Sequence, residues 1–94
     1  MLRIRDVESA FTGKLGAEVD RSGDHVYFYL EYGGSEYTVG KLSHSWRADL
    51  NDSQISLLAH KLRLKKQEFQ QFVDCTLDAS KTIELWQGRR PKVD

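Results

Sequence analysis

The chain has 94 residues, of which 39% are hydrophobic and 30% are charged, and its formal net charge is zero. This composition indicates one small globular domain and excludes a disordered chain, and its neutrality argues against strong non-specific attraction to nucleic acid. The single cysteine excludes an internal disulfide. We expect a cytoplasmic protein without a membrane segment, because no apolar run approaches about 20 residues and the N-terminus lacks the apolar region of a secretory signal.

The first half of the chain predicts one helix and three strands. Apolar residues at helical spacing predict a helix over residues 3–13, and a short strand is expected near Ala17–Arg21. Two longer strands, His25–Tyr32 and Glu36–Leu42, flank Gly33–Gly34 and predict an antiparallel hairpin. Alternation along its second strand places on one face Tyr37, Val39 and Lys41, and on the other Thr38, Gly40 and Leu42.

The second half of the chain predicts three helices. The first follows the N-cap candidates Asn51, Asp52 and Ser53 and runs to about Leu64. The second buries a stripe of Phe69, Phe72 and Val73. The third begins near Asp78–Ala79 and ends at Gly88, before Pro91.

The expected order is therefore α-β-β-β-α-α-α, which defines an α+β domain with a three-stranded antiparallel sheet packed against helices. We treat residues 1–94 as one domain with three parts: an α-β-β-β-α core over 2–64, a helical extension over 65–88 and a basic tail over 89–94. The seven apolar side chains of the extension are too many to leave in water, so we expect its helices to pack onto the core.

Two histidines mark the two ends of the predicted hairpin. His25 stands at the start of its first strand and His44 just beyond the end of its second. Antiparallel pairing brings these ends to the same edge of the sheet. Because histidines in general ionise near neutral pH, the pair suits acid–base chemistry or phosphate contact. The alternative is that both rings are ordinary edge residues packed on Tyr27 or Trp46.

The same residues resemble the HicA-type toxins, a family with a double-stranded-RNA-binding-domain-like fold that cleaves messenger RNA. Gly23, His25 and Phe28 stand in the frame of the family's Gly-Ser-His-His-x-Phe motif, and the segment YTVGKLSHS brings His44 to its later histidine position. The resemblance covers residues 2–64. Asp24 and Val26 replace the family's serine and second histidine, and no proline precedes His44.

This resemblance implies a metal-independent endoribonuclease in which His25 is the general acid–base group and His44 is a second proton-transfer group or phosphate contact. Asp24 could orient the His25 ring, although its charge would also repel phosphate. The RNA-binding candidates are the cations Lys41, Arg47, Lys61, Lys65 and Lys66. The implied partners are RNA and an antitoxin protein, with a homo-oligomer as a further expectation.

The segment from Asp52 to Val73 carries a competing pattern. Two short helices joined by a basic turn, followed by Gln67, Gln70 and Gln71, are typical of a helix-turn-helix that reads DNA. The basic helical pair could then bind DNA or a partner protein without catalysis. A helical hairpin that only completes the core gives the same pattern, and the glycine usual in such a turn is replaced by Arg63.

Metal and cofactor chemistry have little support in the sequence. The three histidines and Cys75 lack the spacing of paired metal ligands, and the chain has no glycine-rich phosphate loop or dinucleotide fingerprint. We therefore expect no metal and no cofactor. Cys75 follows an apolar pair, which favours a small buried residue over a nucleophile.

Overall fold

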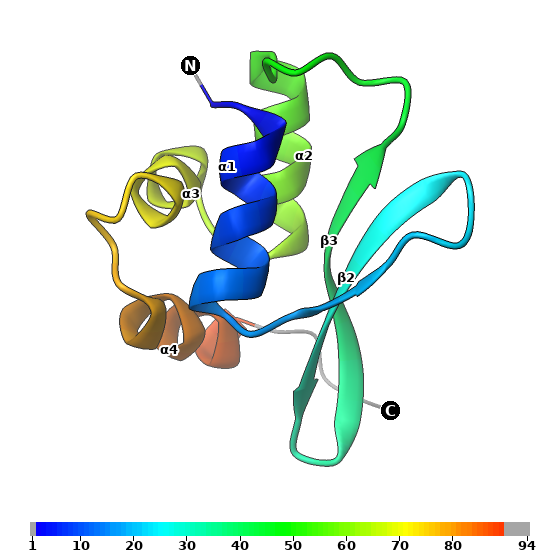
Figure 1. Cartoon of the computed structure of the whole chain (residues 1–94). Coiled ribbons are helices and arrows are strands. Elements are labelled where there is room, and N and C mark those ends of the chain that lie inside the picture. The colour runs from blue at the N-terminus through cyan, green and yellow to red at the C-terminus, as the bar shows by residue number, and fades with distance from the viewer. Residues whose placement is uncertain (1, 90–94) are drawn as a thin grey trace.

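The structure, a computed structural model, describes residues 2–89 and confirms the α+β class with a three-stranded antiparallel sheet (Figure 1). The elements are α1 (Ile4–Ser9), η1 (Ala10–Lys14), β1 (Glu18–Asp20), β2 (His25–Tyr32), β3 (Ser35–Ser43), α2 (Asp52–Lys61), α3 (Lys66–Val73) and α4 (Ala79–Arg89). The sheet order is β1-β2-β3, so β1 and β3 form its edges. No helix within residues 2–89 is long and apolar enough to cross a membrane. Of the predicted tail over 89–94, Arg89 instead belongs to α4, and residues 90–94 lie outside the described residues.

The first helix changes its geometry halfway. The sequence predicts one regular helix over residues 3–13, whereas α1 ends at Ser9 and continues as the π-helical turn η1. In this wider turn the Leu15 N–H donates to the Ala10 carbonyl at 3.3 Å. The turn keeps Phe11 fully buried in line with Val7. The sequence therefore predicts the apolar face of this helix correctly but not the change of helical geometry at Ala10.

A β-bulge in β3 breaks the predicted alternation of its faces. Phe28 pairs with Gly40 but Tyr29 pairs with Thr38, which leaves Val39 as an extra residue. Val39 and Gly40 are consequently both buried, while Lys41 is exposed. The expectation that Val39 and Lys41 share a face is therefore wrong. The bulge turns Lys41 outward, opposite Tyr27.

The helices gather on one side of the sheet (Figure 1). On this inner face, Phe11 stacks on Phe28 with ring centroids 4.8 Å apart. Phe69 and Phe72 also pack against the Phe11 ring, each with a centroid distance of 6.1 Å. All four phenylalanines are fully buried. The helices after residue 65 thus pack onto the core, as the sequence predicts.

Helix α4 covers the far end of the hairpin. Trp86 is buried and meets Tyr32 and Tyr37 edge-to-face, at centroid distances of 5.8 and 5.2 Å. The helix continues through Gly88 to Arg89, one residue beyond its expected end. Arg89 then joins α4 to α3 through Glu68, with a shortest nitrogen–oxygen distance of 2.7 Å. The extension is therefore part of the same core.

Candidate functional site

A groove lies where β3 faces α2. It encloses about 400 Å³ and is lined by His25, Lys41, Ser43, Trp46, Leu57, Leu58, His60 and Lys61. We call it the α2–β3 groove. Its size falls in the range of small-molecule and nucleotide sites.

Strand pairing and helical spacing together build the groove. The register pairs His25 with Ser43 and Tyr27 with Lys41, so the start of β2 and the end of β3 supply one wall. Leu57, His60 and Lys61 follow at i, i+3 and i+4 along α2 and supply the other.

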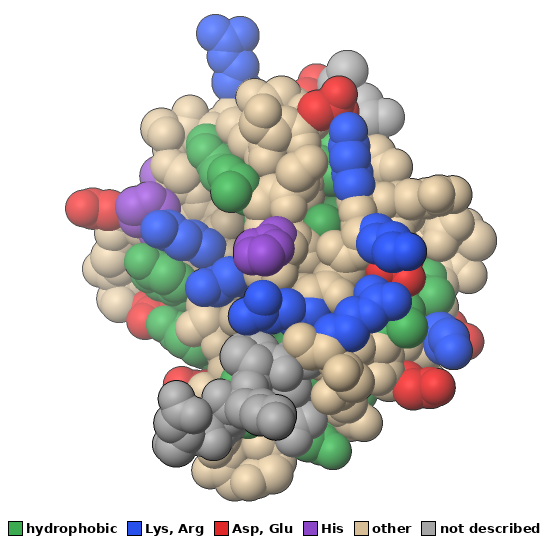
Figure 2. Space-filling view, turned by 180° about the vertical axis from the view of Figure 1, so that it is seen from behind, with side chains coloured by type: hydrophobic (Ala, Val, Ile, Leu, Met, Phe, Trp, Pro, Cys, Tyr) green, Lys and Arg blue, Asp and Glu red, His purple; other side chains and the backbone are tan. Residues whose placement is uncertain are grey.

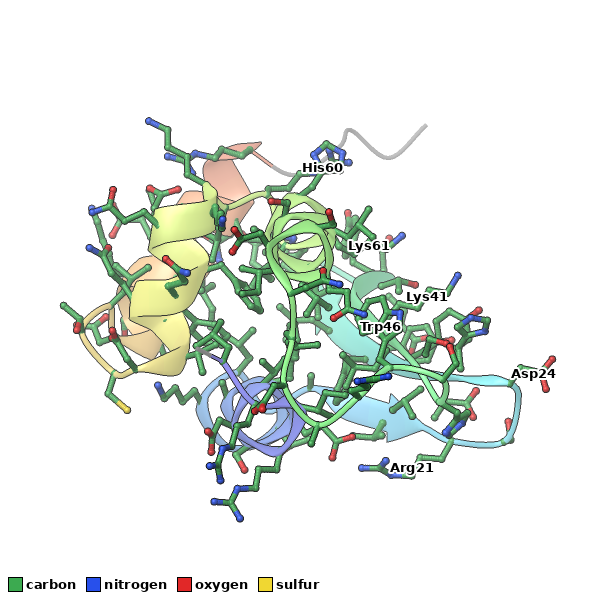
Figure 3. The ribbon with its side chains drawn as sticks, turned by 90° about the horizontal axis from the view of Figure 1, so that it is seen from above. Arg21, Asp24, Lys41, Trp46, His60 and Lys61 are labelled. Atoms are coloured by element: carbon green, nitrogen blue, oxygen red, sulfur yellow. The ribbon has the colours of Figure 1, made fainter. Side chains whose placement is uncertain are left out.

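Trp46 belongs to the turn that follows β3, where its N–H donates to the Ser43 carbonyl at 3.1 Å. Figure 3 shows Lys61, Lys41 and Trp46 in succession beside α2, on the side that faces the sheet. The same view shows Asp24 at the tip of the β1–β2 turn, pointing away from these residues. Asp24 therefore does not line the groove, and its orienting role beside His25 stays a prediction.

The α2–β3 groove carries cationic and no acidic side chains. Its charged lining consists of Lys41 and Lys61, accompanied by two histidines. Neither lysine takes part in any of the five ion pairs found within the described residues. Figure 2 shows Lys and Arg side chains gathered around a histidine on the face of the molecule hidden in Figure 1. Such a lining favours an anionic ligand.

The groove also offers apolar and aromatic surface. Leu57 leaves 62% of its area exposed, and Trp46 is half-buried. A large exposed leucine beside a partly open tryptophan is typical of a contact surface. The ligand that suits this lining is therefore an anion with a planar, weakly polar portion.

A row of rings extends the groove over the outer face of β2. His25 and Tyr27 lie 6.2 Å apart between ring centroids, and Tyr27 stacks near Tyr29 at the same spacing. Lys41 Nζ stands 5.9 Å from the centre of the Tyr27 ring. Partial burial, helped by the carboxylates of Asp20 and Glu36, raises the pKa of the Tyr29 hydroxyl.

Three of the seven predicted site residues line the α2–β3 groove: His25, Lys41 and Lys61. The other four lie elsewhere. His44 directly follows Ser43 at the expected edge of the sheet, but it is exposed and outside the lining. Arg47 lies beside Asp49 in a separate shallow hollow.

The two remaining lysines belong to the start of α3. Lys66 forms an ion pair with Asp52, at 3.0 Å, which links α3 to α2. Lys65 is exposed, and its backbone N–H donates to Glu68 Oε1 at 2.7 Å. Neither lysine lines the groove.

His60 is a functional candidate that the sequence pattern alone does not single out. It lines the same groove as His25, although the two lie far apart along the chain. A usable signal was present, because Leu57 precedes His60 by three residues and therefore shares its helix face. An apolar residue on the otherwise polar flank of a helix indicates a contact surface.

Within residues 2–89, no three His, Cys, Asp or Glu side chains come together in a way that could hold a metal ion. No protein-family model matches the chain, and comparison with curated proteins and with solved structures finds no match either. Function therefore has to be inferred from the groove itself.

Proposed function

We propose that the protein binds single-stranded RNA in the α2–β3 groove. The observation that carries this proposal is a lining with two unpaired lysines, two histidines and no acid around the exposed surface of Trp46 and Leu57. Phosphate groups require the cations, and bases require flat apolar surface. Proteins that bind single strands combine these two features.

The row of rings favours a strand over a single small anion. Tyr27 and Tyr29 continue from His25 across the outer face of the sheet, so bases beyond the groove have rings on which to stack. Ser43 adds a hydroxyl to the lining, which suits contact with a ribose 2′-hydroxyl. Both features support RNA as the ligand.

We extend the proposal to RNA cleavage, because His25 and His60 line one groove. One histidine would take the proton from the 2′-hydroxyl, whose oxygen then attacks the adjacent phosphorus. The other would give a proton to the departing 5′-oxygen, leaving a 2′,3′-cyclic phosphate and a 5′-hydroxyl. Lys41 and Lys61 would stabilise the charge that develops on the phosphate oxygens.

A toxin-like role, a cytoplasmic location and an antitoxin partner belong to the same proposal, through the resemblance of residues 2–64 to HicA-type toxins. The alternative, binding of DNA by the α2–α3 helical pair, depends on Lys65 and Lys66. The ion pair between Lys66 and Asp52 makes this pair less suited to phosphates than the groove lysines.

Binding is tested by fluorescence anisotropy with a labelled single-stranded oligoribonucleotide and its DNA counterpart. The Lys41→Ala/Lys61→Ala double variant should bind on the order of tenfold more weakly. The slope of its log binding constant against log salt concentration should be smaller in magnitude by about 1.4. The matched control is Lys65→Ala/Lys81→Ala, which removes equal charge outside the groove. Equal losses in both double variants, or no binding by the wild type, would contradict the proposal.

Cleavage is tested with the same RNA and single histidine variants. We expect His25→Ala and His60→Ala each to lower the rate by about 10²–10⁴-fold while binding persists. His44→Ala should cleave like the wild type if the groove is the catalytic site. A loss of cleavage confined to His25→Ala and His44→Ala would assign the second proton-transfer role to His44 instead of His60. If the wild type leaves the RNA intact, the cleavage proposal is wrong and only the binding proposal remains.

A further inference from the structure

A second cavity adjoins the α2–β3 groove at the end of α2. It encloses about 340 Å³, and its lining shares His60 and Lys61 with the groove. Arg63, Tyr37 and Trp86 belong to the second cavity alone. Because two residues line both spaces, a ligand that occupies the groove can continue into the second cavity past Lys61.

Arg63 occupies a backbone position that normally belongs to glycine. Its φ is 61°, in the left-handed region, where a side chain is strained. Two hydrogen bonds require this conformation: Arg63 N–H donates to the His60 carbonyl at 3.0 Å, and Leu64 N–H to the Ala59 carbonyl at 2.9 Å. They form a Schellman motif, whose central residue is usually glycine. An arginine there destabilises the fold relative to glycine, so its side chain calls for a functional reason.

The Arg63 side chain is also without a partner. It forms no ion pair or hydrogen bond with any described residue, and its Nε is buried without an acceptor. Glu68, a nearby acid, is already bound by Arg89 at 2.7 and 3.4 Å. Glu36 lines the cavity but lies on the β3 side, opposite Glu31. A guanidinium that lines a cavity and has a buried Nε without an acceptor suits an anionic group with several oxygen acceptors.

We propose that Arg63 binds the phosphate of a second nucleotide, next to the one held at Lys61. This inference rests on the proposed RNA binding and sets the smallest ligand that fills the whole site, which is two linked nucleotides. The second nucleotide lies between Arg63 and the wall formed by the rings of Tyr37 and Trp86. That wall is preformed, because the two rings already meet edge-to-face at 5.2 Å. The Glu36 carboxylate repels phosphate and so directs it to the Arg63 side of the cavity.

The test is an Arg63→Gly variant, because glycine relieves the backbone strain while it removes the guanidinium. We expect its affinity for an oligoribonucleotide to fall about tenfold, equal to about 1.4 kcal/mol, while its melting temperature is unchanged or higher. Its affinity for a mononucleotide should equal that of the wild type, since one nucleotide fills only the groove. Arg63→Lys should recover part of the lost oligonucleotide affinity, because it restores the charge without the planar fork.

The matched control is Cys75→Gly. Cys75 is exposed, so the expectation of a small buried residue is wrong. It has a φ of 74° directly after the C-cap of α3, and it lies beside a different cavity. This variant should gain stability in the same way and keep the wild-type affinity. Full oligonucleotide affinity in Arg63→Gly, or an equal loss for the mononucleotide, would overturn the inference while leaving RNA binding in the groove intact. A wild type that binds no RNA would overturn both proposals.

Discussion

Single residues decide where the groove lysine of β3 points. Gly40 lies directly under the Phe11 ring, where a Cβ atom would stand 2.7 Å from Phe11 Cζ. The missing side chain lets Phe11 reach Phe28, and the neighbouring bulge turns Lys41 to the outer face. Gly40 therefore affects both the packing of Phe11 in the core and the position of Lys41 in the groove.

Gly40→Ala should destabilise the protein by about 1–3 kcal/mol, because Phe11 is fully buried and cannot move aside without disturbing its neighbours. Chemical denaturation measures the loss. Gly23→Ala is the control, since a Cβ at that position meets nothing within 4 Å; it should change stability by no more than about 0.5 kcal/mol. A Gly40→Ala protein as stable as the Gly23→Ala protein would show that the ring has room to shift.

At the scale of elements, the sequence predicts the helices and strands themselves better than the irregular turns and bulges within them. Apolar spacing identified the hairpin and all four helical segments, because that spacing reflects which face is buried. The π-helical turn η1 and the β3 bulge lie where Phe11 packs against Gly40, a contact between distant parts of the chain. No local pattern contains that information.

The attachment of α4 makes stability depend on pH. The Arg89 side chain, and next the Lys65 backbone N–H, hold the pKa of Glu68 below its ordinary value. A lowered folded-state pKa means that the ionised form stabilises the fold at neutral pH. This contribution is lost as the pH falls below the ordinary glutamate value of about 4.3 and through the folded-state pKa.

Glu68→Gln should therefore lower the free energy of unfolding at pH 7 by about 1 kcal/mol or less, since Arg89 is 38% exposed and screened by solvent. The difference from the wild type should shrink as the pH is lowered towards 3. Urea denaturation across this pH range provides the measurement. Glu84→Gln, which removes a more exposed partner of Lys81, serves as the control and should change stability little. A Glu68→Gln deficit that stays constant or grows on acidification would contradict this role.

At the scale of the whole molecule, the site arises from folding and is only partly visible in the sequence. The hairpin alone predicts that His25 and the residues around His44 share an edge, and the pairing of His25 with Ser43 agrees with that expectation. The second wall comes from α2, whose position depends on the buried side chains beneath it. The spacing of Leu57 and His60 indicates that they share a helix face, but only tertiary packing places that face opposite His25 and Lys41.

The central claim is that RNA occupies the α2–β3 groove, and an NMR titration tests it most directly. A ¹⁵N-labelled protein is titrated with a short single-stranded oligoribonucleotide, and the backbone and indole resonances are followed. The account predicts that the largest shifts fall on the Trp46 indole and on the amides of His25, Lys41, His60 and Lys61. Shifts centred on Gln67, Gln70 and Lys65 would instead assign binding to the helical pair, and an unchanged spectrum would contradict RNA binding altogether.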